Sequence, residues 1–328
     1  MKEKLIMIKS EKNTVNVFSV GGCGINLLKK LTTTDEMANV KRCFIDTSMS
    51  NLRNVETTDD EVFLFEGVDG SGKERKENHE IIGKNAKHIL SKFPPSKFNI
   101  LISSGSGGSG SVLGPTLASH IQSADSQVVV ILVGSTSSEI EIENSMKTLM
   151  SYDSIAHRTK SPIVMHYLEN SKESPRAVID EAAIAAIKAL LVLFSGQNDE
   201  LDTADLRHWL DHKDLGHELV SLHFCVSEAG YRESGSVVTV ATLAHHSQDT
   251  LLTPLPAYQC VGYVTRNEAD SFVGDSPLHY AISSELVATT HKRLSATLKE
   301  VKDQLGSTVS REKLYGKDTE ITDHGLIL

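Results

Sequence analysis

The sequence predicts an α/β protein, in which a mostly parallel sheet is followed by a long central helix and a smaller α+β domain. Two observations predict this fold. In the first half of the 328 residues, short β-branched runs alternate with amphipathic or Ala/Leu-rich segments, which is the pattern of βαβ units. Some of these runs, such as residues 128–133, are apolar throughout, as strands covered on both faces should be.

The expected elements follow the chain in order. Strands are predicted in the first half at residues 15–20, 42–45, 62–65, 99–103, 128–133 and 162–167, with helices at residues 73–93, 109–121 and 139–157. Residues 175–196 then form a long helix that is apolar around most of its circumference. A helix of this kind is buried between layers, so we place it between two domains.

The second half is expected to form the smaller domain, with strands at residues 219–226, 236–244 and 259–264. A last helix is predicted from about Pro277 to Leu305, ended by Gly306 in the usual capping position. The polar residues 307–328 are expected to form a tail that becomes ordered only against another surface. The chain therefore divides at residues 1–173, 174–212 (central helix and loop), 213–276 (smaller domain) and 277–328 (helix and acidic tail).

Composition and charge exclude several classes of protein. The net charge of −10 and pI of about 5.8 have the wrong sign for covering a phosphate backbone, so no direct nucleic-acid partner is expected. The four cysteines form no C-x-x-C pair, which indicates free thiols rather than a zinc or redox motif. Residues 1–13 lack a signal-peptide apolar stretch, and the most apolar run, residues 182–194, is too short to span a membrane. We expect a soluble, cytoplasmic protein with no membrane partner.

Two glycine-rich loops each follow a predicted strand and open a predicted helix. The first loop is Gly21, Gly22, Cys23 and Gly24, and the second is Gly105, Ser106, Gly107, Gly108, Ser109, Gly110 and Ser111. Glycines let the backbone turn tightly and bring its N–H groups against phosphate oxygens at a helix N-terminus. The first loop resembles a Rossmann fingerprint without the G-x-G-x-x-G spacing. Two such loops at one sheet edge predict a cradle for a phosphate chain, against the alternative of plain glycine-rich turns.

A third glycine segment runs from Gly67 to Lys73 and includes Gly70 and Gly72. It matches most of a P-loop, but a P-loop needs Ser or Thr after the lysine to hold magnesium. Glu74 stands there instead and would repel phosphate. We expect a loop that senses the terminal phosphate rather than a P-loop.

An acidic segment follows the long helix and contains Asp202 and Asp205. Carboxylates can orient water against a terminal phosphate, and residues three apart can face the same side of a helical turn. The alternative is an acidic surface turn. His208 and His212 have the spacing of metal ligands on a helix but lack the H-E-x-x-H pattern, so a solvated helix face is preferred and no metal-ligand site is predicted.

In this order the motifs resemble those of the tubulin/FtsZ superfamily. The second glycine loop resembles the G-G-G-T-G-S-G signature of that family, and the first loop, with Asn26 behind it, resembles the first nucleotide loop. Asp46 and Thr47 resemble the second loop, and residues 67–73 match the third, which is tied to the γ-phosphate in the family. The lack of a long linker before the tail is most similar to the tubulins of large bacteriophages; a plasmid-segregation tubulin is the nearest rival.

The resemblance implies further site residues. Glu143 and Lys147 match the residues that contact ribose and base, although a lysine replaces arginine. Asp180 in the central helix corresponds to the guanine contact. Asp202-x-x-Asp205 resembles the catalytic N-x-D-x-x-D of bacterial members, with Glu200 in place of the asparagine.

The function implied by the resemblance is that of a GTP-binding filament protein. GTP or GDP would be held with Mg²⁺ by one subunit, and Asp202 and Asp205 of the next would position water for hydrolysis. The partner would be the protein itself, head to tail, with the acidic tail docked on a basic patch of the neighbour. The filament would position or segregate DNA or phage particles in the host bacterial cytoplasm. An NAD-type oxidoreductase and a non-catalytic nucleotide-binding scaffold remain as alternatives.

Overall fold

A computed structural model describes residues 13–31, 39–53, 55–264, 273–284 and 286–306. The described strands form one sheet in the order β3-β2-β1-β4-β5-β6-β8-β11-β9-β10-β7. Neighbours from β3 to β8 are parallel, whereas β11 runs antiparallel to both β8 and β9. The expected α/β fold with its parallel sheet is therefore confirmed.

The strands lie close to their predicted places in the first half. They are β1 (Val15–Val20), β2 (Val40–Asp46), β3 (Val62–Leu64), β4 (Phe98–Ser104), β5 (Gln127–Ser135) and β6 (Ile163–Asn170). The later strands are β7 (Asn198–Asp199), β8 (Leu219–Cys225), β9 (Val237–Ala244), β10 (Tyr258–Val264) and β11 (Leu278–Ser283).

The described helices alternate with the strands in the first half and cluster around the sheet. They are α1 (Gly21–Lys30), α2 (Arg75–Lys92), α3 (Ser109–Ser123), α4 (Glu139–Thr159), α5 (Arg176–Phe194), α6 (Thr203–Leu210), α7 (Glu228–Glu233) and α9 (Leu286–Gly306). No helix in the described ranges combines the length and hydropathy needed to cross a bilayer.

Two hydrophobic layers sandwich the sheet because its strands alternate their side chains between opposite faces. On β5, Val129 and Ile131 pack into the layer that contains α1 and α5. Val130 and Leu132 of the same strand face the layer with α2, α3, α4 and Leu294 of α9. Each strand is thus apolar on both sides, which explains why the strands appear in the sequence as uninterrupted apolar runs.

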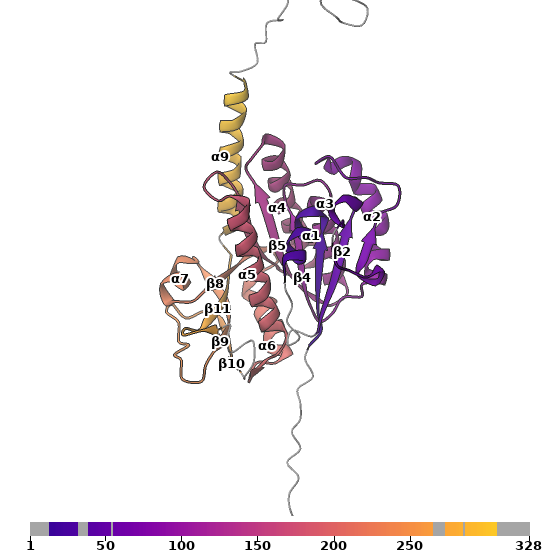
Figure 1. Ribbon diagram of the computed structural model, residues 1–328. Coiled ribbons are helices and arrows are strands. Elements are labelled where there is room, and N and C mark those ends of the chain that lie inside the picture. The colour runs from indigo at the N-terminus through magenta and orange to yellow at the C-terminus, as the bar shows by residue number, and fades with distance from the viewer. Residues whose placement is uncertain (1–12, 32–38, 54, 265–272, 285, 307–328) are drawn as a thin grey trace, which may run out of the picture.

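The central helix α5 crosses the middle of the molecule, between the α1–α4 region and the strands β8–β11 (Figure 1). Its residues from Ala183 to Phe194 are mostly buried, and Tyr280 of β11 donates a hydrogen bond to the Ala189 carbonyl at 2.8 Å. At 19 residues and 1.5 Å per residue, α5 is about 28 Å long. Residues next to Arg176 and residues next to Phe194 are therefore separated by about that distance.

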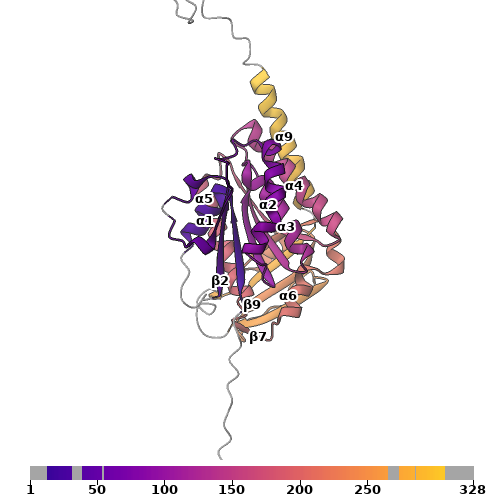
Figure 2. The same cartoon turned by 90° about the vertical axis from the view of Figure 1, so that its right-hand side faces the viewer.

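The last helix is shorter than predicted, and a strand precedes it. The last helix begins at Leu286 rather than near Pro277, because residues 278–283 form β11 between β8 and β9. The expected boundary between residues 276 and 277 thus separates β11 from its own sheet neighbours. In addition, β8 pairs with β6, so the C-terminal strands continue the first sheet instead of forming a sheet of their own. The strands β2 and β9 belong to the same sheet. Figure 2 shows α9 projecting from the body beside α4.

Candidate functional site

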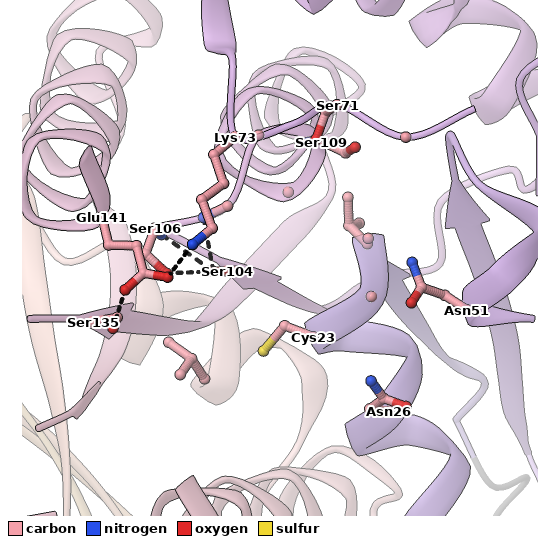
Figure 3. A pocket seen from close by; sticks show the side chains of 18 of the residues that line it. Cys23, Asn26, Asn51, Ser71, Lys73, Ser104, Ser106, Ser109, Ser135 and Glu141 are labelled. Atoms are coloured by element: carbon pink, nitrogen blue, oxygen red, sulfur yellow. Dashed lines mark hydrogen bonds and ion pairs between the residues drawn. The ribbon is translucent and has the colours of Figure 1, made fainter. Parts of the chain in front are cut away.

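A cavity of about 860 Å³ lies beyond the carboxyl ends of the parallel strands, where open α/β sheets bind ligands. It is bordered by the first glycine loop (residues 21–24), the second glycine loop (residues 105–111) and the third loop (residues 67–73). The lining includes Gly21, Gly22, Cys23, Asn26, Asp46, Gly70, Gly72, Ser106, Gly107, Gly108, Ser109, Gly110 and Asp180. The structure therefore brings most of the predicted binding residues together (Figure 3).

The first and second glycine loops lie back to back. Gly21 has a φ of +69° at the start of α1, a conformation that favours glycine. A Cβ added there would lie 3.2 Å from the amide nitrogen of Gly110. Any side chain at Gly21 would therefore push the two loops apart.

Gly24 and Gly105 do not line the cavity, although both were predicted to bind nucleotide. A Cβ on Gly24 would lie 2.5 Å from the Ile102 carbonyl oxygen, so this glycine lets α1 pack closely on β4. The Gly105 N–H donates to the Val133 carbonyl at 2.8 Å, and its own carbonyl accepts a hydrogen bond from Thr148 at 2.9 Å. Both glycines support the loops from behind rather than facing the cavity.

The second glycine loop presents backbone donors and hydroxyl groups at the N-terminus of α3. The side chain of Ser104 accepts hydrogen bonds from the amides of Ser106 and Gly107, at 3.2 and 3.1 Å. The Ser109 amide donates to the Ser71 hydroxyl of the third loop at 2.9 Å. These contacts fix the loop so that its polar groups border one end of the cavity, where a helix N-terminus favours an anion.

The third loop closes over the cavity through Lys73. This residue has a φ of +65°, a strained conformation for a side-chain-bearing residue. Its ammonium group lies 2.6 Å from Glu141 of α4, which also accepts a hydrogen bond from Ser135 at 2.9 Å. Burial acts to raise the pKa of Glu141, but the hydrogen bonds from Lys73 and Ser135 outweigh it and hold the pKa below its usual value. Figure 3 shows Lys73 reaching across to Glu141.

The loop that follows β2, with Asp46 and Thr47, forms another wall of the cavity. Asp46 accepts hydrogen bonds from the Thr47 amide at 2.7 Å and from the Asn51 side chain at 2.6 Å. Burial raises the pKa of Asp46 above its usual value despite these bonds. The hydroxyls of Thr47 and Ser109 are 2.6 Å apart, so this wall is joined to the second glycine loop.

The far end of the cavity is formed by α1 and the start of α5. Asp180 is buried. Its Oδ2 atom lies 2.7 Å from Nζ of Lys30 and 3.8 Å from Nε of Arg176. Burial, together with the negative charge of Asp180, raises the pKa of the Cys23 thiol to about 12. Cys23 is therefore a neutral, weakly polar wall of the cavity rather than a nucleophile.

Glu143 and Lys147 do not reach the cavity, which corrects their predicted place as ribose and base contacts. They pair with each other at 3.5 Å, and Glu143 also binds Lys302 of α9 at 2.8 Å. Glu141 faces the cavity instead. Two residues along a helix correspond to about 200° of rotation, so Glu141 and Glu143 cannot share a face. Ser71 and Lys73 of the predicted third loop also line the cavity. Lining residues outside every predicted motif include Ser104, Ser135, Asn170 and Arg176.

Asp202 and Asp205 lie beyond the opposite end of α5, where Figure 1 shows α6. Asp202 accepts hydrogen bonds from the amides of Ala204 and Asp205, and Asp205 accepts one from the Asp202 amide. These backbone hydrogen bonds hold the pKa of Asp202 below its usual value. Glu200 in the same loop has a φ of +77°. The structure thus keeps both aspartates away from the cavity of their own chain.

The predicted solvated face at His208 and His212 is partly covered. His212 is buried, and both rings pack against Tyr258 of β10, with centroids at 4.5 and 5.9 Å. Within the described ranges no group of three or more His, Cys, Asp or Glu side chains could hold a metal ion.

Comparison with known proteins finds similar sequences among phage tubulin-like proteins. No protein-family model matches the sequence. The chain is 26% identical over 300 residues to a phage tubulin-like protein of Pseudomonas phage phiKZ, covering 87% of this chain and 90% of that protein. The chain is therefore similar to the phage tubulin-like proteins.

Solved structures agree with this assignment. The tubulin-like chain matches a protofilament of TubZ from bacteriophage PhiKZ with a TM-score of 0.83 and 25% identity, over 97% of this chain and 100% of that one. It matches the GDP complex of the phage tubulin PhuZ with a TM-score of 0.84 and 24% identity, over 96% and 99% of the two chains. The predicted resemblance and the fold are therefore confirmed over nearly the whole tubulin-like chain.

Proposed function

We propose that this protein binds GTP and assembles head to tail into a filament, hydrolysing GTP at the junction between subunits. One observation carries the proposal: the cavity between the glycine loops lies at one end of α5, and a pair of aspartates lies at the other. Because α5 is about 28 Å long, Asp202 and Asp205 cannot reach the cavity of their own chain. A second copy stacked end to end would bring them there.

The cavity residues fit a guanine nucleotide. Amides and hydroxyls of the two glycine loops would hold the phosphates. A Cβ at Gly110 would lie only 3.0 Å from the Ser104 amide nitrogen, so position 110 has no room for a larger residue. Lys73 supplies a cation near the third loop. Asp180, with Cys23 and Asn26 beside it, is placed at the far end to accept hydrogen bonds from the guanine ring. Glu141 takes the ribose role that was first assigned to Glu143.

Mg²⁺, when bound, would neutralise charge on the β- and γ-phosphates. Such a site needs few protein ligands, because Mg²⁺ keeps several waters and binds phosphate oxygens directly. In the assembled state Asp205 and Asp202 would accept hydrogen bonds from the attacking water and orient it toward the γ-phosphate. Loss of the γ-phosphate would weaken the junction, because nucleotide state and assembly are thermodynamically linked.

The relatives support the self-assembly in this proposal. One relative was solved as a protofilament and another with GDP, which supports a self-assembling guanine-nucleotide protein. We propose that the filament positions or segregates DNA or phage particles in the cytoplasm of a bacterial host.

The tail was predicted to dock on a basic patch of the neighbouring subunit. Residues 307–328, with Asp318, Glu320 and Asp323, lie outside the described residues. The expected patch consists of four cations on α9, which are Lys292, Arg293, Lys299 and Lys302. Arg293 is bound to Glu169, and Lys302 is bound to Glu139 and Glu143. The tail would therefore have to compete with these pairs or bind Lys292 and Lys299.

A mixing experiment tests the divided site. Gly107→Asp should block the cavity, and Asp205→Ala should disable the acidic end. Each variant alone should show little GTP turnover. In an equal mixture, roughly one quarter of head-to-tail junctions would join an intact cavity to an intact Asp205, because each junction takes its two halves from different subunits.

The recovery of turnover on mixing, at about a quarter of the parental rate, is the expected result. A mixture that stays inactive while both variants still co-assemble would refute the divided site. Thermal protection of the parent protein by NAD but not by GTP would instead favour a dinucleotide-dependent enzyme. Tight GTP binding without turnover at any protein concentration would favour a scaffold.

A further inference from the structure

We infer that Tyr258 of β10 is a positioning residue for Asp205 in GTP hydrolysis. The inference rests on the proposed function of Asp205. Tyr258 has no place in the cavity and was not singled out by any motif. It is distant in sequence from the acidic loop (residues 198–205) but contacts it through a side-chain hydrogen bond.

The hydroxyl of Tyr258 donates to Oδ1 of Asp205 at 3.1 Å. The other carboxylate oxygen, Oδ2, accepts a hydrogen bond from the Asp202 amide at 3.1 Å. The Asp205 carboxylate is therefore held from two sides, and its plane is fixed. Without the hydroxyl, only the Asp202 amide would hold Asp205, and the carboxylate could rotate about its terminal torsion, which is intrinsically soft.

The ring of Tyr258 is itself held in place. His208 packs against it edge-on at 4.5 Å between centroids, and His212 stacks on it at 5.9 Å with an interplanar angle of 18°. His208 lies on α6 and His212 follows two residues after its end. The end of α6 and the strand β10 are therefore packed together around Tyr258. A phenol with two torsions loses little entropy when it is fixed in this way.

The strand β10 also holds the other end of the acidic loop. Val264 and Tyr263 pair with Asn198 and Asp199 of β7. A Cβ on Gly262 would lie 2.4 Å from Oδ1 of Asn198, and that oxygen accepts a hydrogen bond from the Leu201 amide at 3.2 Å. The loop is thus attached to one rigid strand at both ends, with Glu200 in a left-handed conformation between them.

Tyr258 stays a hydrogen-bond donor at neutral pH. Burial raises the pKa of its phenol well above the ordinary value, and the nearby Cys260 and Asp205 raise it further. The contact to Asp205 is therefore that of a neutral donor to an acceptor oxygen.

The test is Tyr258→Phe, which keeps the ring between the two histidines and removes only the hydroxyl. Tyr231→Phe is the matched control, because Tyr231 donates to the Pro254 carbonyl at 2.6 Å, a backbone acceptor away from the acidic loop. Turnover per assembled subunit, nucleotide affinity, and the critical concentration with a non-hydrolysable GTP analogue are measured for both, and for Asp205→Ala.

Turnover of Tyr258→Phe should fall about ten- to a hundredfold, as expected for a misplaced catalytic group, while affinity and critical concentration stay within about twofold. In single-turnover measurements, adding Tyr258→Phe to Asp205→Ala should cause no further loss, because coupled residues are not additive. Tyr231→Phe should match the parent protein.

Three outcomes would overturn the inference. Turnover of Tyr258→Phe within twofold of the parent, with Asp205→Ala inactive, would refute the role of Tyr258 and leave the proposed function standing. A raised critical concentration in Tyr258→Phe would show a structural role instead. Parental turnover in Asp205→Ala would refute the proposed function itself.

Discussion

Gly107 offers a direct test of the phosphate cradle, because the structure predicts which substitutions the fold tolerates. A Cβ at Gly107 would meet only the Ser104 side chain, at 3.6 Å, which is an ordinary contact. Gly107 also lines the cavity. Gly107→Ala and Gly107→Asn should therefore fold normally, and Gly107→Asp should fold as well but place a negative charge in the cradle.

The magnitude follows from Coulomb's law. A carboxylate roughly 5 Å from one phosphate charge, at an effective dielectric constant of about 20, is repelled by about 3 kcal/mol. That energy corresponds to about a hundredfold loss of GTP affinity. Gly107→Asn has nearly the same shape without the charge, so its loss should be much smaller.

The assay is a titration of each variant with a fluorescent GTP analogue, at two salt concentrations, with thermal unfolding as the check on folding. The Asp variant should bind about a hundredfold more weakly than the Asn variant, and the gap should narrow at high salt because screening weakens the repulsion. If the Asp and Asn variants bind within threefold of each other, residues 105–111 do not contact the phosphates.

Three further predictions follow from the site. Deleting residues 307–328 should abolish polymerisation but leave GTP binding intact; polymerisation at the parental critical concentration would contradict tail docking. Asp202→Ala should give polymers that persist after GTP is added, since the nucleotide is not cleaved, whereas normal phosphate release from this variant would rule out its role. At pH 8, Cys23 should react with iodoacetamide about a thousandfold more slowly than a thiol of pKa 9, because its pKa is about 12 and only the thiolate reacts. The labelling is measured by mass spectrometry, and fast labelling of Cys23 would contradict the raised pKa of this thiol.

The parallel half of the fold was predictable because its signal is local. Each strand there is covered on both faces, so its residues form a continuous apolar run, as in β5 from Val128 to Val133. The glycine loops were located for the same reason, since a strand, a glycine turn and a helix follow one another directly. Predicted strand ends in this half differ from the observed ends by at most three residues.

The strand β11 was not predictable in this way. Its residues 278–283 continue without a break into a segment with helical periodicity, and a helix was predicted over both. What makes them a strand is pairing with β8 and β9, which lie 35 or more residues earlier in the chain. Such pairing depends on tertiary context and overrides local preference.

Tertiary context also explains why Glu141 lines the cavity, whereas the resemblance pointed to Glu143. Glu143 and Lys147 form an ion pair on one helix face, and sequence spacing alone cannot show which face of a helix meets the cavity. That choice depends on Lys302 of α9 and on Lys73 of the third loop, which are far away in sequence and bind Glu143 and Glu141 respectively. A local motif can therefore identify the helix that borders the site and still select the wrong carboxylate.

The length of α5 connects these details to function. The helix fixes the cavity and the acidic loop to opposite ends of one rigid, buried element, so the separation between Asp180 and Asp205 cannot be closed by loop motion. A hydrolysis step that needs both ends must therefore recruit a second copy, and its rate must depend on protein concentration below the point at which all subunits are assembled. A turnover rate per subunit that stays constant on dilution would mean that the aspartates at 202 and 205 take no part in the chemistry.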